Sequence, residues 1–243
     1  MYMFIRNDGR NFDQLRPFAF ATNFTKFAEG SVLVNFGNTK VICNASVENK
    51  VPDFLIGKNQ GWLTAEYSML PRATQKRNER KSKIDGRSQE IQRLIGRSLR
   101  SCLDLSLLGE RQIIVDCDVI QADGGTRCAS ICGGWLATYF AAQNLLEKNI
   151  ISQNPIKNIV AAISVGIVEY EKNQQILVDL DYSEDSNALT DMNVIMNQNL
   201  EIVEIQGTAE HQFFSRQQLN QMLDLAEQSL LKIIEKQKEY IKN

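Results

Sequence analysis

With 243 residues, a net charge of −2, 43% hydrophobic residues and 23% charged residues, the chain has the composition of an ordinary globular protein with a substantial core. No apolar run approaches the ~20 residues of a membrane span, and the five residues before Arg6 are too few for a secretion signal, so we expect a cytoplasmic protein that binds no membrane. Five scattered cysteines without a C-x-x-C pair predict free buried thiols, and with His211 as the one histidine, a Cys/His zinc site and a Ser-His-Asp triad are both disfavoured.

The first third of the chain is predicted to form strands. Residues 1–18 mix polar and aromatic side chains, which is typical of an irregular arm or an edge strand. The β-rich runs 31–36 and 40–47 are separated by Gly37-Asn38, which predicts a tight hairpin. A loop with Pro and Gly covers 49–61, and a short apolar stretch around Trp62 follows it.

The segment from Arg72 to Arg100 is strongly basic, with ten Lys and Arg against three acidic residues in an otherwise acidic chain. Its first part, up to Gly86, has almost nothing apolar to bury and predicts a loop. Residues 88–103 have the periodicity of an amphipathic helix, with Arg93, Arg97 and Arg100 on one face. The stripe could be an ordinary solvated face, or could carry a possible Glu90–Arg93 pair, but the clustering favours polyanion binding.

A Gly-Gly turn separates the predicted strand 113–120 from the predicted helix 127–148. The turn directs free backbone N–H groups, the helix dipole, the Thr126 hydroxyl and the Arg127 guanidinium to one small volume, where a phosphate group would be well satisfied. A tight connection with a solvated arginine is the alternative at this point.

The second half alternates between strands and helix in the same way as the first. Strands are predicted at 158–170, 176–182, 192–196 and 200–206, with turns at 171–175 and 197–199. Ser215 and Gln218 form a capping box that opens a final helix with a continuous apolar stripe. We therefore predict one mixed α+β domain over residues 1–243, built from two similar halves.

Five carboxylates lie within 13 residues of this second half, and no basic residue stands among them. They are Asp179, Asp181, Glu184, Asp185 and Asp191. On the predicted strand, Asp179 and Asp181 share one face, and Asp185 lies beyond the strand's end. Oxygen ligands without His or Cys suit Mg²⁺ or Mn²⁺, although a solvated edge strand running into an acidic turn would have the same pattern.

A phosphate-binding turn, a basic stripe and an acidic patch together indicate phosphoryl or nucleotidyl transfer. The pattern G-x-x-x-x-G-K-[ST] is absent, which disfavours an ordinary NTPase.

Several blocks of sequence, in order along nearly the whole chain, resemble one known family. They are Asp8-Gly-Arg10, 30–34, Gly61-Trp62, 64–67, 69–72, 90–97, 116–127, 190–193 and 204–210. On these blocks the chain resembles the ribonuclease PH family, the phosphate-dependent 3′-to-5′ exoribonucleases of transfer RNA maturation.

The resemblance implies a ribosomal-S5-like α+β fold, a homohexamer built as a trimer of dimers, and RNA substrates, above all tRNA precursors. It implies that inorganic phosphate is the co-substrate and that Mg²⁺, or Mn²⁺, is the cofactor. The implied site residues are Arg87, Gly125, Thr126 and Arg127 for phosphate, Asp179 and Asp185 for catalysis and metal binding, and Arg72, Arg77 and Arg80 for RNA. We add Arg93 and Arg97 of the basic helix to the RNA-binding set.

Two alternatives from other functional classes stay open. A non-catalytic RNA-binding subunit of an exosome-like ring would share the fold, but the joint presence of the phosphate arginines and the acids argues against it. A hydrolytic metal nuclease would use the acidic patch alone and release monophosphates, which leaves the Gly-Thr-Arg turn without a role.

Overall fold

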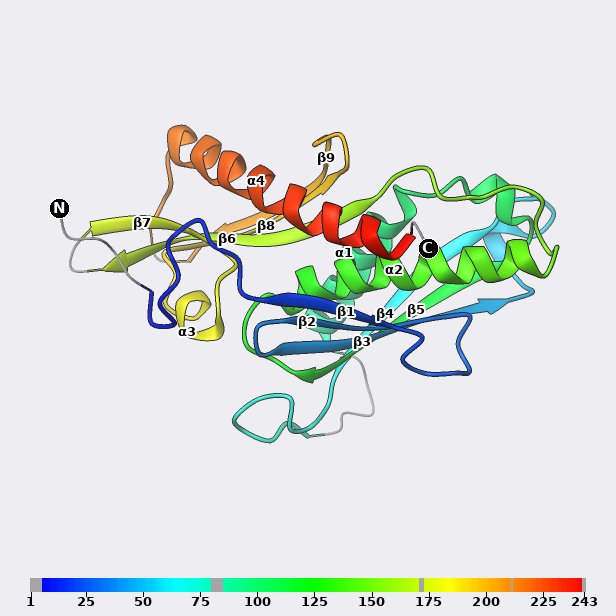
Figure 1. The fold of residues 1–243 in the computed structure, drawn as a ribbon, viewed down its shortest axis with the longest axis horizontal. Helices are drawn as coiled ribbons and strands as arrows, with labels where there is room; N and C mark the ends of the chain where they lie inside the picture. The colour runs from blue at the N-terminus through cyan, green and yellow to red at the C-terminus, as the bar shows by residue number, and fades with distance from the viewer. Residues whose placement is uncertain (1–5, 80–84, 171–172, 211, 242–243) are drawn as a thin grey trace.

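The computed structural model describes residues 6–79, 85–170, 173–210 and 212–241. Two sheets, four α-helices and two short 3-10 helices, Asp53–Leu55 and Leu105–Leu108, make up this part of the chain (Figure 1). The elements run in the order β1 Phe18–Thr22, β2 Gly30–Phe36, β3 Thr39–Glu48, β4 Trp62–Met69, α1 Gly86–Arg100, β5 Gln112–Gln121, α2 Thr126–Glu147, β6 Val160–Tyr170, β7 Asn173–Val178, α3 Tyr182–Asp185, β8 Thr190–Asn197, β9 Ile202–Ala209 and α4 Arg216–Ile241. The predicted α+β class is confirmed, and no helix in these ranges is long and apolar enough to cross a bilayer.

The first sheet has the strand order β1-β2-β3-β5-β4. The predicted hairpin is confirmed, because Phe36 pairs with Thr39 across the two-residue loop and Gly37 takes the positive φ of 54° that such a turn requires. Strands β4 and β5 are parallel, so α1 makes the crossover between them. From the sequence, β4 was predicted only as a short apolar stretch around Trp62 and not as a strand.

The second sheet is antiparallel, in the order β7-β6-β8-β9. Helix α4 lies along β6, β7 and β8, as the red helix of Figure 1 shows. Its start is the predicted capping box, since the Ser215 hydroxyl accepts from the Gln218 backbone N–H and the Gln218 side chain accepts from the Ser215 N–H.

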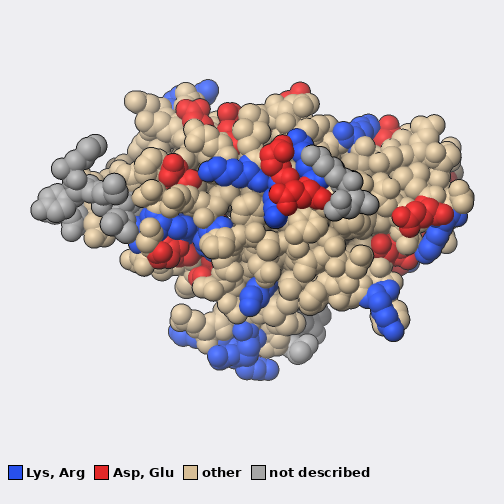
Figure 2. Space-filling model, in the orientation of Figure 1, with Lys and Arg blue, Asp and Glu red and all other residues tan. Residues whose placement is uncertain are grey.

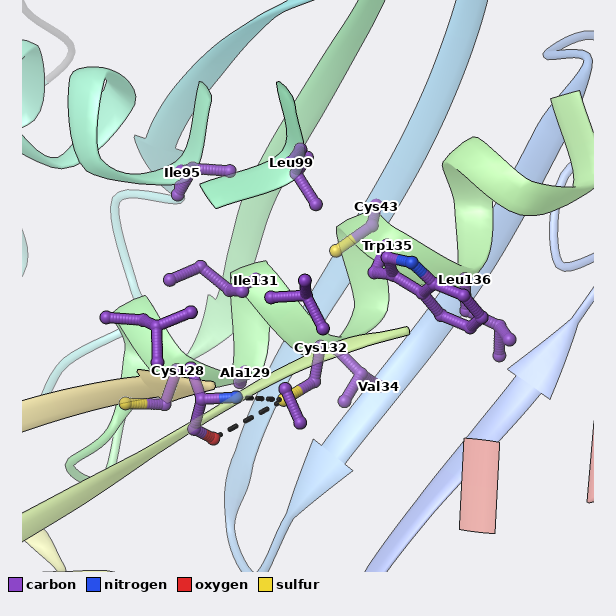
Figure 3. Close-up of a cluster of buried hydrophobic side chains, with 14 of the residues drawn as sticks. Val34, Cys43, Ile95, Leu99, Cys128, Ala129, Ile131, Cys132, Trp135 and Leu136 are labelled. Carbon is purple, nitrogen blue, oxygen red and sulfur yellow. Dashed lines mark hydrogen bonds between the residues drawn. The ribbon is translucent and has the colours of Figure 1, made fainter. Parts of the chain in front are cut away.

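Helix α2 lies at the centre of the molecule, in contact with β2 and β3 of one sheet and β6 of the other. Figure 3 shows its side chains among those of α1, β2 and β3. Cys132 both donates to the carbonyl and accepts from the N–H of Ala162 on β6, at 3.4 and 3.3 Å. All five cysteines are free and buried, as predicted, and one hydrophobic cluster contains residues of both sheets.

The sequence placed two features of the second half wrongly. Strand β7 ends at Val178, so Asp179 and Asp181 do not share a strand face; Asp179 has a left-handed φ of 53°, and Asp181 caps the short helix α3. The predicted turn at 171–175 is shorter than expected, because Asn173 already pairs with Tyr170. Residues 171–172 lie outside the described residues.

Candidate active site

The turn between β5 and α2 is shaped by two successive glycines in left-handed backbone conformation. Gly124 has φ 75° and Gly125 φ 67°. Gly125 is the N-cap of α2 and supplies no side chain to the orphan N–H groups of the first helical turn, whereas α1 is capped by Asp85, whose side chain accepts from the Ser88 N–H. The N-terminus of α2 therefore offers uncapped donors and the positive end of a helix dipole to an anion.

A cavity of about 1110 Å³ lies over this turn. The beginnings of α1 and α2, the strands β4, β5 and β8, and the helix α3 all contribute to its walls. Five predicted site residues line it: Arg87, Gly125, Thr126, Arg127 and Asp185. The structure thus brings the predicted phosphate residues together with one of the two predicted acids.

Arg127 has capacity left for an anion. Its Nη2 donates to the Glu90 carboxylate at 3.0 Å. The sequence had suggested Arg93 as the partner of Glu90, but the structure pairs Glu90 with Arg127. Its Nε is buried and has no hydrogen-bond partner among the described residues. Buried donors are almost always satisfied, so this N–H, on a side chain that lines the cavity, has hydrogen-bonding capacity for an acceptor bound there.

Two carboxylates from neighbouring elements line the same cavity, Asp185 at the end of α3 and Asp191 on β8. Burial raises the pKa of Asp185, partly offset by Arg127 and Arg87. Burial, and then repulsion from Asp185, raises the pKa of Asp191 to about 6. Two partly buried carboxylates with raised pKa values line one cavity, and a bound cation would favour their charged forms.

Asp179 lies elsewhere. Its side chain is 2% exposed and does not line the cavity. Arg16 takes both of its oxygens: the backbone N–H donates to Oδ2 at 2.7 Å, and the guanidinium donates to Oδ1 at 2.6 Å and Oδ2 at 3.1 Å. In this geometry Arg16 engages the Asp179 carboxylate, and Asp191 is the second acid that lines the cavity with Asp185. Metal binding by Asp179 and Asp185 stays a prediction.

The predicted RNA-binding arginines lie outside the cavity lining. Arg72 and Arg77 are exposed on the loop after β4, where Figure 2 shows basic side chains gathered on a protrusion, and Arg80 lies outside the described residues. Arg93 is exposed on α1. Arg97 is 48% exposed but engaged, since its guanidinium donates twice to Glu204 of β9, at 2.5 and 3.0 Å.

Some residues of the cavity were not singled out from the sequence. The Tyr67 hydroxyl lies 2.9 Å from the Thr126 hydroxyl. Glu66, Asp116 and Asp118 line the far wall, where Glu66 stands opposite Asp116 on the parallel strands β4 and β5. Alternating acids on a strand that leads into the glycine turn were the available signal. Burial, followed by Glu66 and Asp118, raises the pKa of Asp116.

The carboxylate oxygens in the cavity suit a hard divalent cation that is also coordinated by oxygens of a bound substrate. No group of three or more His, Cys, Asp or Glu side chains in the described parts of the chain could enclose a metal. Mg²⁺ is commonly held by one or two carboxylates together with water and substrate phosphates, and Asp185 and Asp191 provide that number of oxygen ligands beside the phosphate arginines. The residues present therefore fit Mg²⁺ or Mn²⁺.

Comparison with known proteins gives the same family along the whole chain. Residues 14–143 match the family model described as "3′ exoribonuclease family, domain 1", and residues 158–229 match its domain 2. A ribonuclease PH of Bacillus subtilis (strain 168) is 57% identical over 240 residues, which cover 98% of this chain and 97% of the relative. A ribonuclease PH of Crocosphaera subtropica is 56% identical over 230 residues, 94% of each chain.

A solved structure supports the fold. An Archaeoglobus fulgidus exosome with RNA bound to the active site superposes with a TM-score of 0.78 at 22% identity, covering 96% of this chain and 92% of the other. At that identity the likeness concerns the architecture alone.

Proposed function

Because this chain belongs to the ribonuclease PH family and is a phosphorolytic 3′-to-5′ exoribonuclease, we propose that it trims tRNA precursors, and other RNAs, from their 3′ ends with inorganic phosphate held at the N-terminus of α2. The buried, unpartnered Nε of Arg127, beside a helix start that no side chain caps, is the observation that carries the proposal.

Arg87, the Thr126 hydroxyl, Arg127 and the first N–H groups of α2 would hold the phosphate as the nucleophile. Guanidinium groups suit this role because they present several donors in a planar fork and keep their charge. A phosphate oxygen attacks the phosphorus of the last phosphodiester, the bond from that phosphorus to the 3′ oxygen breaks, and the 3′ oxygen takes up a proton. The products are a nucleoside diphosphate and an RNA one nucleotide shorter.

Asp185 and Asp191 would hold the cation, and Asp185 is the proposed proton donor to the departing 3′ oxygen. Burial raises the pKa of Asp185 in the metal-free site, so Asp185 can hold the proton for the departing 3′ oxygen while the cation rests on the Asp191 carboxylate. Mg²⁺ or Mn²⁺ bound there would neutralise the crowded phosphate oxygens of the two substrates. Asp179 takes a supporting role, because its carboxylate is engaged by Arg16.

The arginines outside the cavity would guide the RNA backbone to it. Arg72, Arg77 and Arg93 are exposed, and clustered Arg and Lys side chains attract phosphodiesters without regard to sequence. Arg80 joins this set by its sequence, and Arg97 is the weakest member, because Glu204 already balances its charge.

We further propose a homohexamer, built as a trimer of dimers, that works in the cytoplasm. Five free cysteines suit a reducing compartment. Phe27 and Phe213 are 89% and 94% exposed, and apolar side chains of this size are commonly covered in an assembly. Size-exclusion chromatography with light scattering measures the mass; a monomer would contradict the hexamer.

The defining experiment incubates the protein with Mg²⁺ and an RNA that carries a 3′ extension, with and without inorganic phosphate, and identifies the released nucleotide. We expect nucleoside diphosphates only when phosphate is present. Monophosphates released without phosphate would indicate hydrolysis, and RNA binding without release would favour a non-catalytic subunit of an exosome-like ring.

A further inference from the structure

One buried side chain joins the two segments that carry the proposed chemistry. The first is the glycine turn, residues 123–125, which precedes the phosphate residues. The second is the acidic segment, residues 179–185, which ends at Asp185. Arg16, 4% exposed, reaches both: its guanidinium binds the Asp179 carboxylate and also donates to the backbone carbonyls of Asp123 and Gly124.

The two segments are in direct contact at this point. A Cβ added to Gly124 would lie 2.4 Å from the Leu180 carbonyl oxygen and 2.9 Å from the Tyr182 nitrogen, which is closer than any side chain can come. Arg16 itself does not line the cavity, so it touches neither of the proposed substrates. Any effect it has on the reaction must pass through the segments it holds.

We propose that Arg16 is a positioning residue for phosphorolysis, which fixes the phosphate-binding turn at the distance from Asp185 that the transfer requires. The proposal rests on the proposed function, since it assigns the phosphate and the acid to these two segments. One guanidinium with acceptors on both segments adds a buried link between segments that already touch at Gly124. In a reaction that depends on near-attack geometry, a misplacement of ~1 Å can cost on the order of 10²-fold in rate.

Arg6 provides a matched control. It is also buried, and it binds the same acidic segment, through both oxygens of Glu184 and the carbonyls of Val178 and Asp179. None of its hydrogen bonds reaches the glycine turn. A lysine at position 6 or 16 keeps one positive charge but cannot present the planar fork that either site uses.

The test compares Arg16→Lys with Arg6→Lys in the full chain. Thermal unfolding, kcat, the KM for phosphate and the KM for RNA are measured with Mg²⁺ at a temperature where both variants are folded. We expect both substitutions to lower the Tm, but only Arg16→Lys to lower kcat, on the order of 10²-fold, with the KM for RNA nearly unchanged. Hydrogen exchange of the glycine turn should accelerate in Arg16→Lys alone.

Equal kcat values for Arg16→Lys and wild type, or an equal loss in Arg6→Lys, would overturn the positioning role. If Arg16→Lys does not fold, Asp179→Asn provides the second variant, because it removes the charge that orients Arg16 while keeping the side-chain shape; an undiminished kcat there would overturn the proposal as well. Loss of phosphate dependence in the wild type would instead refute the proposed function, which separates the two failures.

Discussion

The hydroxyl oxygens of Tyr67 and Thr126 lie 2.9 Å apart, and this hydrogen bond joins the buried middle of β4 to the first residue of α2. Both residues line the cavity, so the bond restricts the rotation of the Thr126 hydroxyl there. Tyr67→Phe keeps the ring and removes the partner, so we expect the KM for phosphate to rise by roughly 2–10-fold, as the loss of one hydrogen bond of ~0.5–1.5 kcal/mol implies. Steady-state phosphorolysis at varied phosphate measures this. Thr126→Ser is the control that keeps a hydroxyl, and an unchanged KM in Tyr67→Phe would contradict the orienting role.

Arg127 is the proposed phosphate ligand with an unpartnered buried donor. Its substitution should therefore lower kcat more than substitution of the other proposed phosphate ligands. We expect Arg127→Ala to lower kcat on the order of 10²–10³-fold, the cost of deleting one charge-stabilising donor. Glu90→Gln is the control, because it removes the negative charge beside Arg127 and leaves the guanidinium in place. Near-wild-type phosphorolysis by Arg127→Ala would refute the assignment.

The raised pKa of Asp191, about 6 against an ordinary value of 3.8, predicts that this carboxylate weakens the metal-free fold at neutral pH. The folded state holds the proton more tightly than the unfolded state, so the stabilisation is complete below pH ~4 and is lost as the pH rises through about 6. Asp191→Asn should therefore raise the free energy of unfolding at pH 8, relative to wild type, by on the order of 1–3 kcal/mol, and the difference should shrink toward pH 4.

Magnesium should reverse that difference. In thermal melts at pH 8, added Mg²⁺ is expected to raise the Tm of wild type more than that of Asp191→Asn, because the variant keeps only Asp185 of the two proposed cation ligands. An equal response in both proteins would show that the cation does not use Asp191.

Two arginines of the predicted RNA-binding set should contribute differently to the salt dependence of RNA binding. Arg77 is exposed, with no ion pair inside the described ranges, whereas Arg97 is paired with Glu204. We expect Arg77→Ala to weaken RNA binding and to lower the slope of log K against log salt by ~1, as the loss of one phosphate contact does. Arg97→Ala should leave the slope nearly unchanged, and fluorescence anisotropy of a labelled RNA across salt concentrations distinguishes them. Identical slopes would contradict the difference.

Gln237 of α4 connects elements of the two halves, and this predicts a single unfolding transition. Its Nε2 is fully buried and donates to the carbonyls of Cys132 on α2 and Val160 on β6, at 3.1 and 3.2 Å. Gln237→Leu should lower the free energy of unfolding by ~1–3 kcal/mol, since it leaves buried acceptors with one donor fewer. Calorimetry should show one peak in both proteins; two peaks in wild type would contradict a single domain over 1–243.

Local chemistry made part of the fold predictable from the sequence. The Gly37-Asn38 hairpin, the capping box at Ser215 and the glycine turn before α2 each depend on residues within a few positions of one another, and each is found where the sequence predicted it. The same local chemistry determines where the first N–H groups of α2 point, since two adjacent glycines precede the helix; that phosphate binds them stays a prediction.

Long-range partners determine the surroundings of predicted site residues that the sequence alone does not show. The acidic sequence around Asp179 is typical of a metal site. In the fold, Arg16, which is 163 positions away, binds both oxygens of Asp179. Arg97 belongs to a helical stripe that is typical of RNA binding until Glu204, 107 positions on, is found beside it. Neither partner follows from periodicity or spacing, because each depends on which strands become neighbours.

Helix α2 is enclosed by both sheets along most of its length, and its phosphate-binding end cannot move without the rest of the core. These donors are already ordered in the folded protein, so substrate binding does not lose the conformational entropy of assembling them. A consequence concerns sequence variation far from the cavity. A methyl group added at Gly133 would lie 2.7 Å from Val34 Cγ1 and 2.9 Å from Cys43 Sγ, and the helix would have to shift to admit it. Core mutations of this kind should therefore lower phosphate affinity as well as the free energy of unfolding, although they lie far from the cavity.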